Sequence, residues 1–446
     1  MLKMSRATNS EIQVPCNPDL KYLPHQLAAI EYASKIPHTL IADKPGLGKT
    51  ISAIGYINYK NIQRALIICP ASLIYNWKKE LKKWIVGDHK IQLVTSTKDE
   101  LWGDFIIVSY TTATIIEERL SCLSFEVGIL DEVHYLKTRE ANRTEAIIGF
   151  QGIAIQCCNV VMLSGTPIPN RPIEIFPLVE AFAHHVIDKM SYTLFGIKYC
   201  GGHKDKRGHW NFKGATNSKA LGKKLRSGFM IRRSKEAVLK DLPPKRESIV
   251  YIRQSTTAKK LNKKITELSN KYLGEGMDFS EMKNMGQIAT LRRKLGEEKV
   301  VDAVEYICTQ LEGGHEKIVV FAYHKDVIKR LETELSKYNC VKLIGGMTSE
   351  KKNKAIELFQ TNKDVRVFLG QYKAAGLGGT LHASSYVIFV EFDWSSTVNE
   401  QAIDRTHRIG QVNPVLAEYL AYEDSMDVNV LKTHLRKDKV IKEVLE

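Results

Sequence analysis

Two neighbouring features of this chain have the residue types that phosphate chemistry requires. The first is the glycine-rich segment "DKPGLGKT", residues 43–50, which follows a short apolar run. A glycine-rich turn between a strand and a helix lets backbone N–H groups close around phosphate oxygens. In that arrangement Lys49 reaches the β- and γ-phosphates, and the Thr50 hydroxyl holds Mg²⁺. The segment predicts a P-loop for ATP and Mg²⁺, although Asp43 stands where the strict pattern has glycine.

The second feature is a pair of adjacent carboxylates, Asp131 and Glu132, in "VGILDEVHYLK". A P-loop enzyme needs one carboxylate to hold Mg²⁺ and another to orient or deprotonate the attacking water. Adjacent carboxylates are common on protein surfaces, but these two follow an apolar strand, where unpaired charge is costly without a cation. We expect Asp131 to hold the metal and Glu132 to activate water.

Positive charge for the γ-phosphate is expected from the second half of the chain. In "NEQAIDRTHRIGQ", residues 399–411, Arg405 and Arg408 are three positions apart. On a helix that spacing is about one turn, so both side chains would face the same ligand. The alternative is an exposed helix with ordinary surface arginines.

The elements that position these residues form two blocks of alternating strands and helices. Continuous apolar runs are typical of strands buried on both faces of a parallel sheet. In the first block the expected strands are residues 38–42, 65–70, 104–110, 126–132 and 159–165. In the second block they are residues 317–324, 340–346, 365–371 and 386–394. Two such blocks predict an α/β protein with two tandem P-loop-type lobes, each built on a parallel sheet.

The middle of the chain, residues 180–315, lacks these apolar runs. It is rich in Lys, Arg and Gly, and its "LPP" segment at 242–244 cannot lie inside a helix. We therefore expect an N-terminal lobe over residues 1–240 with an insertion near 180–225. The C-terminal lobe would span residues 241–446, with a helical insertion near 255–300.

The first insertion contains a second candidate site. Cys200, His203 and His209 have side chains that ligate zinc, but they are only three and lack a second paired motif. The segment also reads as a basic, aromatic-bearing loop near nucleic acid, or as a solvated insertion anchored by Trp210. The residues of that loop are Lys204, Lys206, Arg207, Trp210 and Phe212.

Composition limits the partners and the setting. The 446 residues include 65 Lys and Arg against 50 Asp and Glu, a formal net charge of +15. This balance favours a polyanion, either nucleic acid or an anionic membrane surface, although a lysine-rich solvated face would give the same count. Neither a secretory signal nor a transmembrane run is recognisable, and the eight cysteines do not suggest a disulfide framework. We expect a monomer that stays in the cytosol or nucleus: cytoplasmic or nucleoid-associated in a bacterium or virus, nuclear in a eukaryote.

The order of the motifs resembles that of the Swi/Snf-type ATPases of helicase superfamily 2, and most of all their compact annealing-helicase (HARP-like) branch. The resemblance covers about residues 20–425. Its segments are "YLPHQLAAI" (22–30), "DKPGLGKT" (43–50), "ALIICPASLIYNWKKEL" (65–81), "VSYTT" (108–112), "DEVH" (131–134), "LSGTPIPNRPIEIFPL" (163–178), "FMIRRSKEAVLKDLPPK" (229–245), "VVFAYHKDVI" (319–328), "IGGMTS" (344–349), "AAGLGGTLHAS" (374–384) and "QAIDRTHRIGQ" (401–411).

The resemblance implies roles for individual residues. It makes Gln26 the adenine-reading glutamine, and it places Gly46 and Gly48 in the phosphate loop with Lys49 and Thr50. It makes Asp131 and Glu132 the metal-binding and water-activating pair, and Arg405 and Arg408 arginine-finger candidates. The residues implied to couple nucleotide state to DNA grip are His134, Ser164, Gly165 and Thr166. In the second lobe the nucleotide-facing positions are Gly376, Gly378 and Gln401.

The chain departs from the family pattern at a few positions. Lys44 and Pro45 replace the usual Glu and Met, and proline stiffens the loop and removes one backbone donor, which predicts weaker phosphate binding. In the second lobe, Ala375 replaces a common glycine and the pair at 379–380 replaces an apolar-Asn pair. We also expect no recruitment domain, since few residues flank the motifs.

The function that the resemblance implies is an ATP-dependent motor on double-stranded or forked DNA, one that remodels or reanneals it. Three alternatives remain open: a strand-separating DNA or RNA helicase, the motor subunit of a restriction or phage-defence complex, and an inactive DNA-binding scaffold. The intact Lys49, Asp131 and Glu132 argue against the scaffold.

Overall fold

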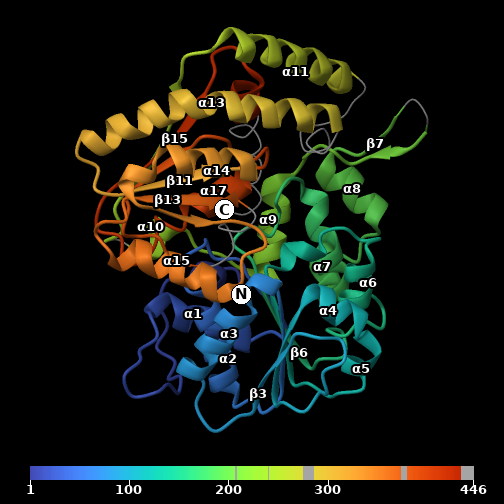
Figure 1. Cartoon of the computed structure of the whole chain (residues 1–446). Coiled ribbons are helices and arrows are strands. Elements are labelled where there is room, and N and C mark those ends of the chain that lie inside the picture. The colour runs from blue at the N-terminus through green and yellow to red at the C-terminus, as the bar shows by residue number, and fades with distance from the viewer. Residues whose placement is uncertain (206–207, 240, 275–285, 373–378, 433–446) are drawn as a thin grey trace. The chain divides into compact units, whose positions relative to one another are not determined.

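The protein is a two-unit α/β chain with one parallel sheet in each unit. The computed structural model describes residues 1–205, 208–239, 241–274, 286–372 and 379–432 (Figure 1). One unit runs from Met1 to Lys240, and the second begins at Asp241. All strand pairs of the two large sheets are parallel. The fold class predicted from the sequence is confirmed.

The first unit is built on a seven-stranded sheet with the order β3-β4-β2-β5-β6-β1-β9. Its strands are β1 (His38–Ile41), β2 (Ala65–Cys69), β3 (Ile91–Val94), β4 (Phe105–Ser109), β5 (Val127–Asp131), β6 (Asn159–Leu163) and β9 (Met230–Ile231). Its helices are α1 (Pro24–Ser34), α2 (Lys49–Lys60), α3 (Ile74–Trp84), α4 (Tyr110–Ile115), α5 (Glu117–Ser121), α6 (Asn142–Ile148), α7 (Phe176–Phe182), α8 (Tyr192–Cys200), α9 (Ser218–Gly228) and α10 (Lys235–Val238). The five strands expected here are all present, whereas β3 and β9 were not expected.

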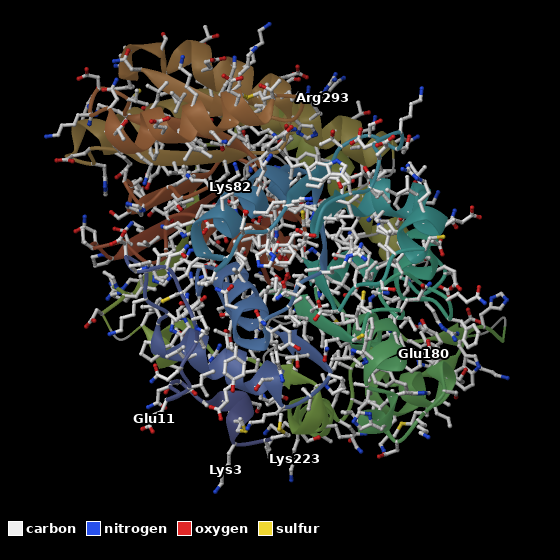
Figure 2. The ribbon with its side chains drawn as sticks, turned by 90° about the horizontal axis from the view of Figure 1, so that it is seen from below. Lys3, Glu11, Lys82, Glu180, Lys223 and Arg293 are labelled. Atoms are coloured by element: carbon white, nitrogen blue, oxygen red, sulfur yellow. The ribbon has the colours of Figure 1, made fainter. Side chains whose placement is uncertain are left out.

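Strand residues of this sheet alternate between two apolar clusters, one on each face. Leu66 and Ile68 of β2 pack into one cluster, and the intervening Ile67 packs into the other together with Trp77 of α3. Side chains of a strand point to opposite faces in turn, so a continuous apolar run is needed where helices cover both faces. Charged side chains stay outside: Lys3, Glu11 and Lys223 point away from the ribbon of this unit (Figure 2).

The segment near 180–225 contains α8 and α9 and, between them, a two-stranded antiparallel ribbon. Its strands are β7 (His203–Lys204) and β8 (Trp210–Asn211). Gly201, with φ of 60°, ends α8 in the left-handed conformation that glycine adopts without strain. The insertion is therefore part helical and part β-ribbon.

The second unit is built on a six-stranded sheet with the order β10-β15-β14-β11-β13-β12. Its strands are β10 (Lys245–Tyr251), β11 (Ile318–Ala322), β12 (Cys340–Leu343), β13 (Val367–Gln371), β14 (Tyr386–Phe389) and β15 (Val415–Ala421). Its helices are α11 (Thr256–Gly274), α13 (Gly286–Glu312), α14 (Lys325–Glu334), α15 (Ser349–Thr361) and α17 (Ser396–Ile403). The four strands expected here are present, whereas β10 and β15 were not expected.

Helices α11 and α13 lie side by side in this unit (Figure 1). α11 buries Ala258 and Ile265 and leaves Lys259, Lys260 and Lys263 exposed, so its lysines form a solvated face. Within the described ranges, no helix combines the length and the apolar character needed to cross a membrane. The eight cysteines form no disulfides.

Candidate nucleotide site

The phosphate loop follows β1 and runs directly into α2. Gly46 and Gly48 have φ of 89° and 77°, a conformation that side chains other than glycine rarely adopt. The Lys49 ammonium donates to the backbone oxygen of Asp43 at 2.9 Å, so the lysine closes the loop on itself. Burial lowers the pKa of Lys49 from its ordinary value, while Glu132, Asp43 and Asp131 act in the opposite direction. Thr50 lies in the first turn of α2.

Helix α1 is held against this loop by two side chains. His25 Nε2 lies 2.9 Å from the backbone oxygen of Leu47, and burial lowers the pKa of His25. Gln26 accepts from the Leu23 N–H at 2.9 Å, and a Cβ at position 48 would lie 2.4 Å from its Nε2. Glycine at 48 is therefore required both by its φ and by the close approach of Gln26, which places the proposed adenine reader beside the loop.

Asp131 ends β5, and all its oxygens accept hydrogen bonds. Its Oδ2 accepts from the indole Nε1 of Trp77 at 2.8 Å, and its Oδ1 accepts from the Glu132 N–H at 2.9 Å. Its backbone oxygen accepts from the Tyr110 hydroxyl at 2.8 Å. Burial, and then the neighbouring Glu132 carboxylate, raises the pKa of Asp131 to about 6. The sequence predicted Trp77 only as a core residue, and no local signal marked it as a partner of Asp131.

Glu132, His134 and Ser164 form a short polar relay next to Asp131. Glu132 has φ of 51°, which is uncommon outside glycine and is often found where a side chain is aimed at a ligand. His134 Nδ1 lies 3.2 Å from Glu132 Oε2 and 3.2 Å from Ser164 Oγ. Ser164 Oγ in turn accepts from the Thr166 N–H at 3.1 Å. The relay connects the loop after β5 to the loop after β6.

Gly165 brings the loop after β6 into contact with the phosphate loop. A Cβ at position 165 would lie 2.6 Å from Pro45 Cγ, so a larger residue would displace the loop. Because β6 lies between β5 and β1, the loops that follow these three parallel strands meet at one edge of the sheet. The structure thus brings together Lys49, Thr50, Asp131 and Glu132 with the residues predicted to couple them.

A buried ion pair fixes the start of the phosphate loop. Arg233, just after β9, donates to both carboxylate oxygens of Asp43 and to the backbone oxygens of His25 and Ala7. Its neighbour Arg232 donates to the backbone oxygens of Ala42, at 2.6 Å, and Gly165, at 3.1 Å. Asp43 is therefore not a defective glycine position, because its carboxylate is the anchor that the arginine binds. The sequence alone did not predict this role for either arginine.

The residues present fit Mg²⁺ and ATP. Asp131 and Glu132 are adjacent, largely buried acids whose mutual repulsion raises the pKa of Asp131. A cation at this edge would relieve that repulsion, and hard cations such as Mg²⁺ take oxygen ligands of this kind. Lys49 and the left-handed glycine turn provide the complementary charge and N–H groups for phosphate.

The second unit places its candidate residues around the end of α17. Gln401 is buried within α17, which ends at Ile403. The expectation that Arg405 and Arg408 share one helical turn is therefore wrong, because both lie in the turns beyond the helix. The Thr406 hydroxyl donates to the backbone oxygen of Ile403 at 2.7 Å and helps to end the helix there.

The two arginines are held by different parts of the second unit. The backbone oxygen of Arg405 accepts from the Leu381 N–H at 2.8 Å, and the Arg408 guanidinium donates to the backbone oxygen of Gly379 at 3.1 Å. Both side chains are partly buried. Gly376 and Gly378 lie outside the described residues.

The zinc alternative has no support within the residues that the structure describes. Burial raises the pKa of Cys200 to about 12, which disfavours the thiolate that zinc requires. His203 lies exposed on the β-ribbon, and no three His, Cys, Asp or Glu side chains in the described ranges come together as a metal site.

Comparison with known families agrees with this geometry. The family model of the SNF2-related domain matches residues 25–312, well over half of the chain, and that of the helicase conserved C-terminal domain matches residues 299–410. The chain belongs to the SNF2-related family. It thereby falls among the superfamily 2 ATPases, and the resemblance inferred from its motifs is confirmed.

Named relatives of this SNF2-related chain include two eukaryotic proteins. It is 32% identical over 424 residues to the human protein named DNA annealing helicase and endonuclease ZRANB3, covering 91% of this chain and 39% of that protein. It is 30% identical over 442 residues to the Caenorhabditis elegans homolog of SWI/SNF-related matrix-associated actin-dependent regulator of chromatin subfamily A-like protein 1, covering 95% of this chain and 62% of that protein. The chain thus spans only part of the length of these relatives.

Among solved structures, a match is found to the SWI2/SNF2 ATPase core of Sulfolobus solfataricus in complex with double-stranded DNA. The identity is 23%, the TM-score is 0.46, and the match covers 97% of this chain and 95% of that one.

Proposed function

We propose that this SNF2-related chain is an ATP-dependent motor that hydrolyses ATP on double-stranded or forked DNA and remodels or reanneals it. The observation that carries the proposal is the meeting of Lys49, Asp131, Glu132 and the His134 relay at one edge of the first sheet. The basic composition, with a net charge of +15, supports a polyanionic track.

Each residue of the site has a task that follows from its surroundings. Lys49 would leave the backbone oxygen of Asp43 and bind the phosphates, while Thr50 and Asp131 would hold Mg²⁺. When bound, Mg²⁺ neutralises charge that develops on the phosphate oxygens. Glu132 would orient the attacking water and take up its proton. We also propose Arg405 and Arg408 as the cations that meet the γ-phosphate, a role that rests on the sequence resemblance.

The His134 relay offers a path by which hydrolysis would be coupled to the rest of the lobe. His134 lies at the same distance from Glu132 and Ser164, so a change in the position of either side chain alters the bonding of the other. The loop that carries Ser164 also contacts the phosphate loop through Gly165 and Pro45. We propose that this loop reports the nucleotide state.

The setting proposed for this activity is wherever the cell keeps its DNA: the cytoplasm or nucleoid of a bacterium or virus, or the nucleus of a eukaryote. We propose that the chain works as a monomer.

A triplex-displacement assay tests the proposal against the strand-separating alternative. A motor that tracks along duplex DNA displaces a third strand from an intact duplex with ATP, and leaves the duplex paired. Displacement of the third strand by the wild-type chain and none by Lys49→Ala supports the proposal. Separation of a partial duplex without third-strand displacement identifies a strand-separating helicase and overturns it.

A further inference from the structure

The β7–β8 ribbon of the first unit carries a tryptophan that the core does not use. Trp210 is 42% exposed, and its ring stacks on Phe212 with centroids 5.7 Å apart and planes at 14°. Lys204 pairs with Trp210 across the ribbon, and its Nζ lies 5.6 Å from the centroid of the ring. The ribbon reaches outward beyond α8 (Figure 1).

Phe212, not Trp210, attaches the ribbon to the lobe. A Cβ at Gly196 or Gly202 would lie 2.4 or 2.7 Å from the Phe212 ring, so the two glycines form the notch that this ring fills. Phe212 also meets Tyr192 edge-on, with centroids 5.5 Å apart. The expectation that Trp210 anchors the insertion is therefore wrong, and a large apolar ring is left in solvent without an anchoring task.

The surroundings of the exposed ring are strongly basic. Residues 198–213 contain five Lys or Arg and one acidic residue, Asp205. The Asp205 carboxylate accepts from the His209 N–H at 3.0 Å and so shapes the turn of the ribbon. His203 and His209 are exposed as well. The partner that fits here is an anion that also offers a flat, apolar face.

Nucleic acid with unpaired bases meets both requirements. Aromatic side chains bind single strands by stacking on bases, which is tolerant of sequence, and cations beside them meet the backbone phosphates. In an intact duplex the base faces are already stacked on one another, so Trp210 has nothing to stack on there. We propose that the β7–β8 ribbon binds the unpaired arm of forked DNA, with a base stacked on Trp210 and Lys204 beside the phosphate backbone. This inference rests on the proposed DNA motor and adds a preference for forks.

Binding of the full chain to two fluorescent DNAs tests the inference: a fork with unpaired arms and a blunt duplex of the same paired length. We expect Trp210→Ala to weaken binding to the fork by roughly 5- to 150-fold, the range of one lost base stack, and to leave duplex binding unchanged. Trp210→Phe should keep most of the fork affinity, whereas Trp210→Leu, which keeps apolar bulk without an aromatic ring, should lose it. These two variants decide the question if the alanine variant does not fold.

The chain provides a matched control in Trp102. This side chain is 60% exposed, and residues 98–104 around it contain three acidic residues and one lysine. Trp102→Ala removes an equally exposed indole from an acidic surrounding, so it should bind both DNAs as the wild type does.

Two outcomes overturn the inference. Unchanged fork binding by Trp210→Ala removes the stacking contact, and the ribbon would then be a surface for a protein partner. An equal loss on fork and duplex means that unpaired bases are not what the ribbon recognises. The proposed function is judged separately, by whether blunt duplex stimulates ATP hydrolysis by the wild-type chain.

Discussion

Replacement of Trp77 by phenylalanine removes one hydrogen bond from the metal-binding carboxylate and keeps an aromatic ring in the core. The indole Nε1 donates to Asp131 Oδ2 at 2.8 Å, inside the lobe, where Trp77 is fully buried. A hydrogen bond to a charged group contributes about 1.5–3 kcal/mol. The bond stabilises the ionised form of Asp131, the form that holds Mg²⁺, and each 1.4 kcal/mol is about tenfold in an equilibrium constant.

We therefore expect Trp77→Phe to weaken Mg²⁺-dependent ATP binding by about 10- to 100-fold, the usual effect of losing a hydrogen-bond partner of a metal ligand. The assay is titration of Mg²⁺ against a fluorescent ATP analogue, followed by Mg²⁺ dependence of hydrolysis. Urea denaturation of the same protein separates this effect from a general loss of stability.

Trp84→Phe is the matched control. Trp84 lies on the same helix, α3, and is 6% exposed, but its Nε1 meets no hydrogen-bond acceptor among the residues that the structure describes. It loses the same atoms without touching Asp131, so its Mg²⁺ dependence should equal that of the wild type. A Trp77→Phe protein with wild-type Mg²⁺ dependence, or an equal shift in Trp84→Phe, would refute the reasoning.

Three further changes test other parts of the site. Glu132→Gln should keep ATP binding and lower turnover by about 10²- to 10⁴-fold, measured by nucleotide titration and steady-state hydrolysis; retained hydrolysis would exclude Glu132 as the base. Asp43→Ala leaves the buried Arg233 without its carboxylate and should cost about 3–5 kcal/mol in urea denaturation, part of which Asp43→Ala combined with Arg233→Met restores; a loss below about 1 kcal/mol would contradict the anchor role. Since the pKa of Asp131 is raised to about 6 and its ionised form is the active one, kcat/KM should fall as the pH drops through about 6, and a profile flat down to about pH 5 would contradict this assignment.

The strands were largely predictable from the sequence because the sheets are parallel and covered on both faces. Runs such as residues 65–70 are apolar at every position, and a short run of that kind is typical of a strand buried on both faces. β10 was missed because it is an edge strand with alternating polar residues, lying where the diproline suggested a connection. β15 did carry a signal, the apolar run at 415–421, which was overlooked.

The candidate site was predictable only in part. Parallel strands bring their carboxyl ends to one edge, so Lys49 and Asp131 could be placed together from the sequence alone. The partners of these residues could not, since Trp77 is 54 positions from Asp131 and Arg233 is 190 positions from Asp43. Such contacts depend on the tertiary fold, and no local pattern encodes them.

The most direct measurement of the central claim is steady-state ATP hydrolysis by the purified chain without nucleic acid and then with duplex, forked and single-stranded DNA and with RNA. The account predicts strong stimulation by duplex or forked DNA that Lys49→Ala abolishes. Hydrolysis that no DNA stimulates, or that RNA alone stimulates, would contradict the assignment of this chain as a DNA motor.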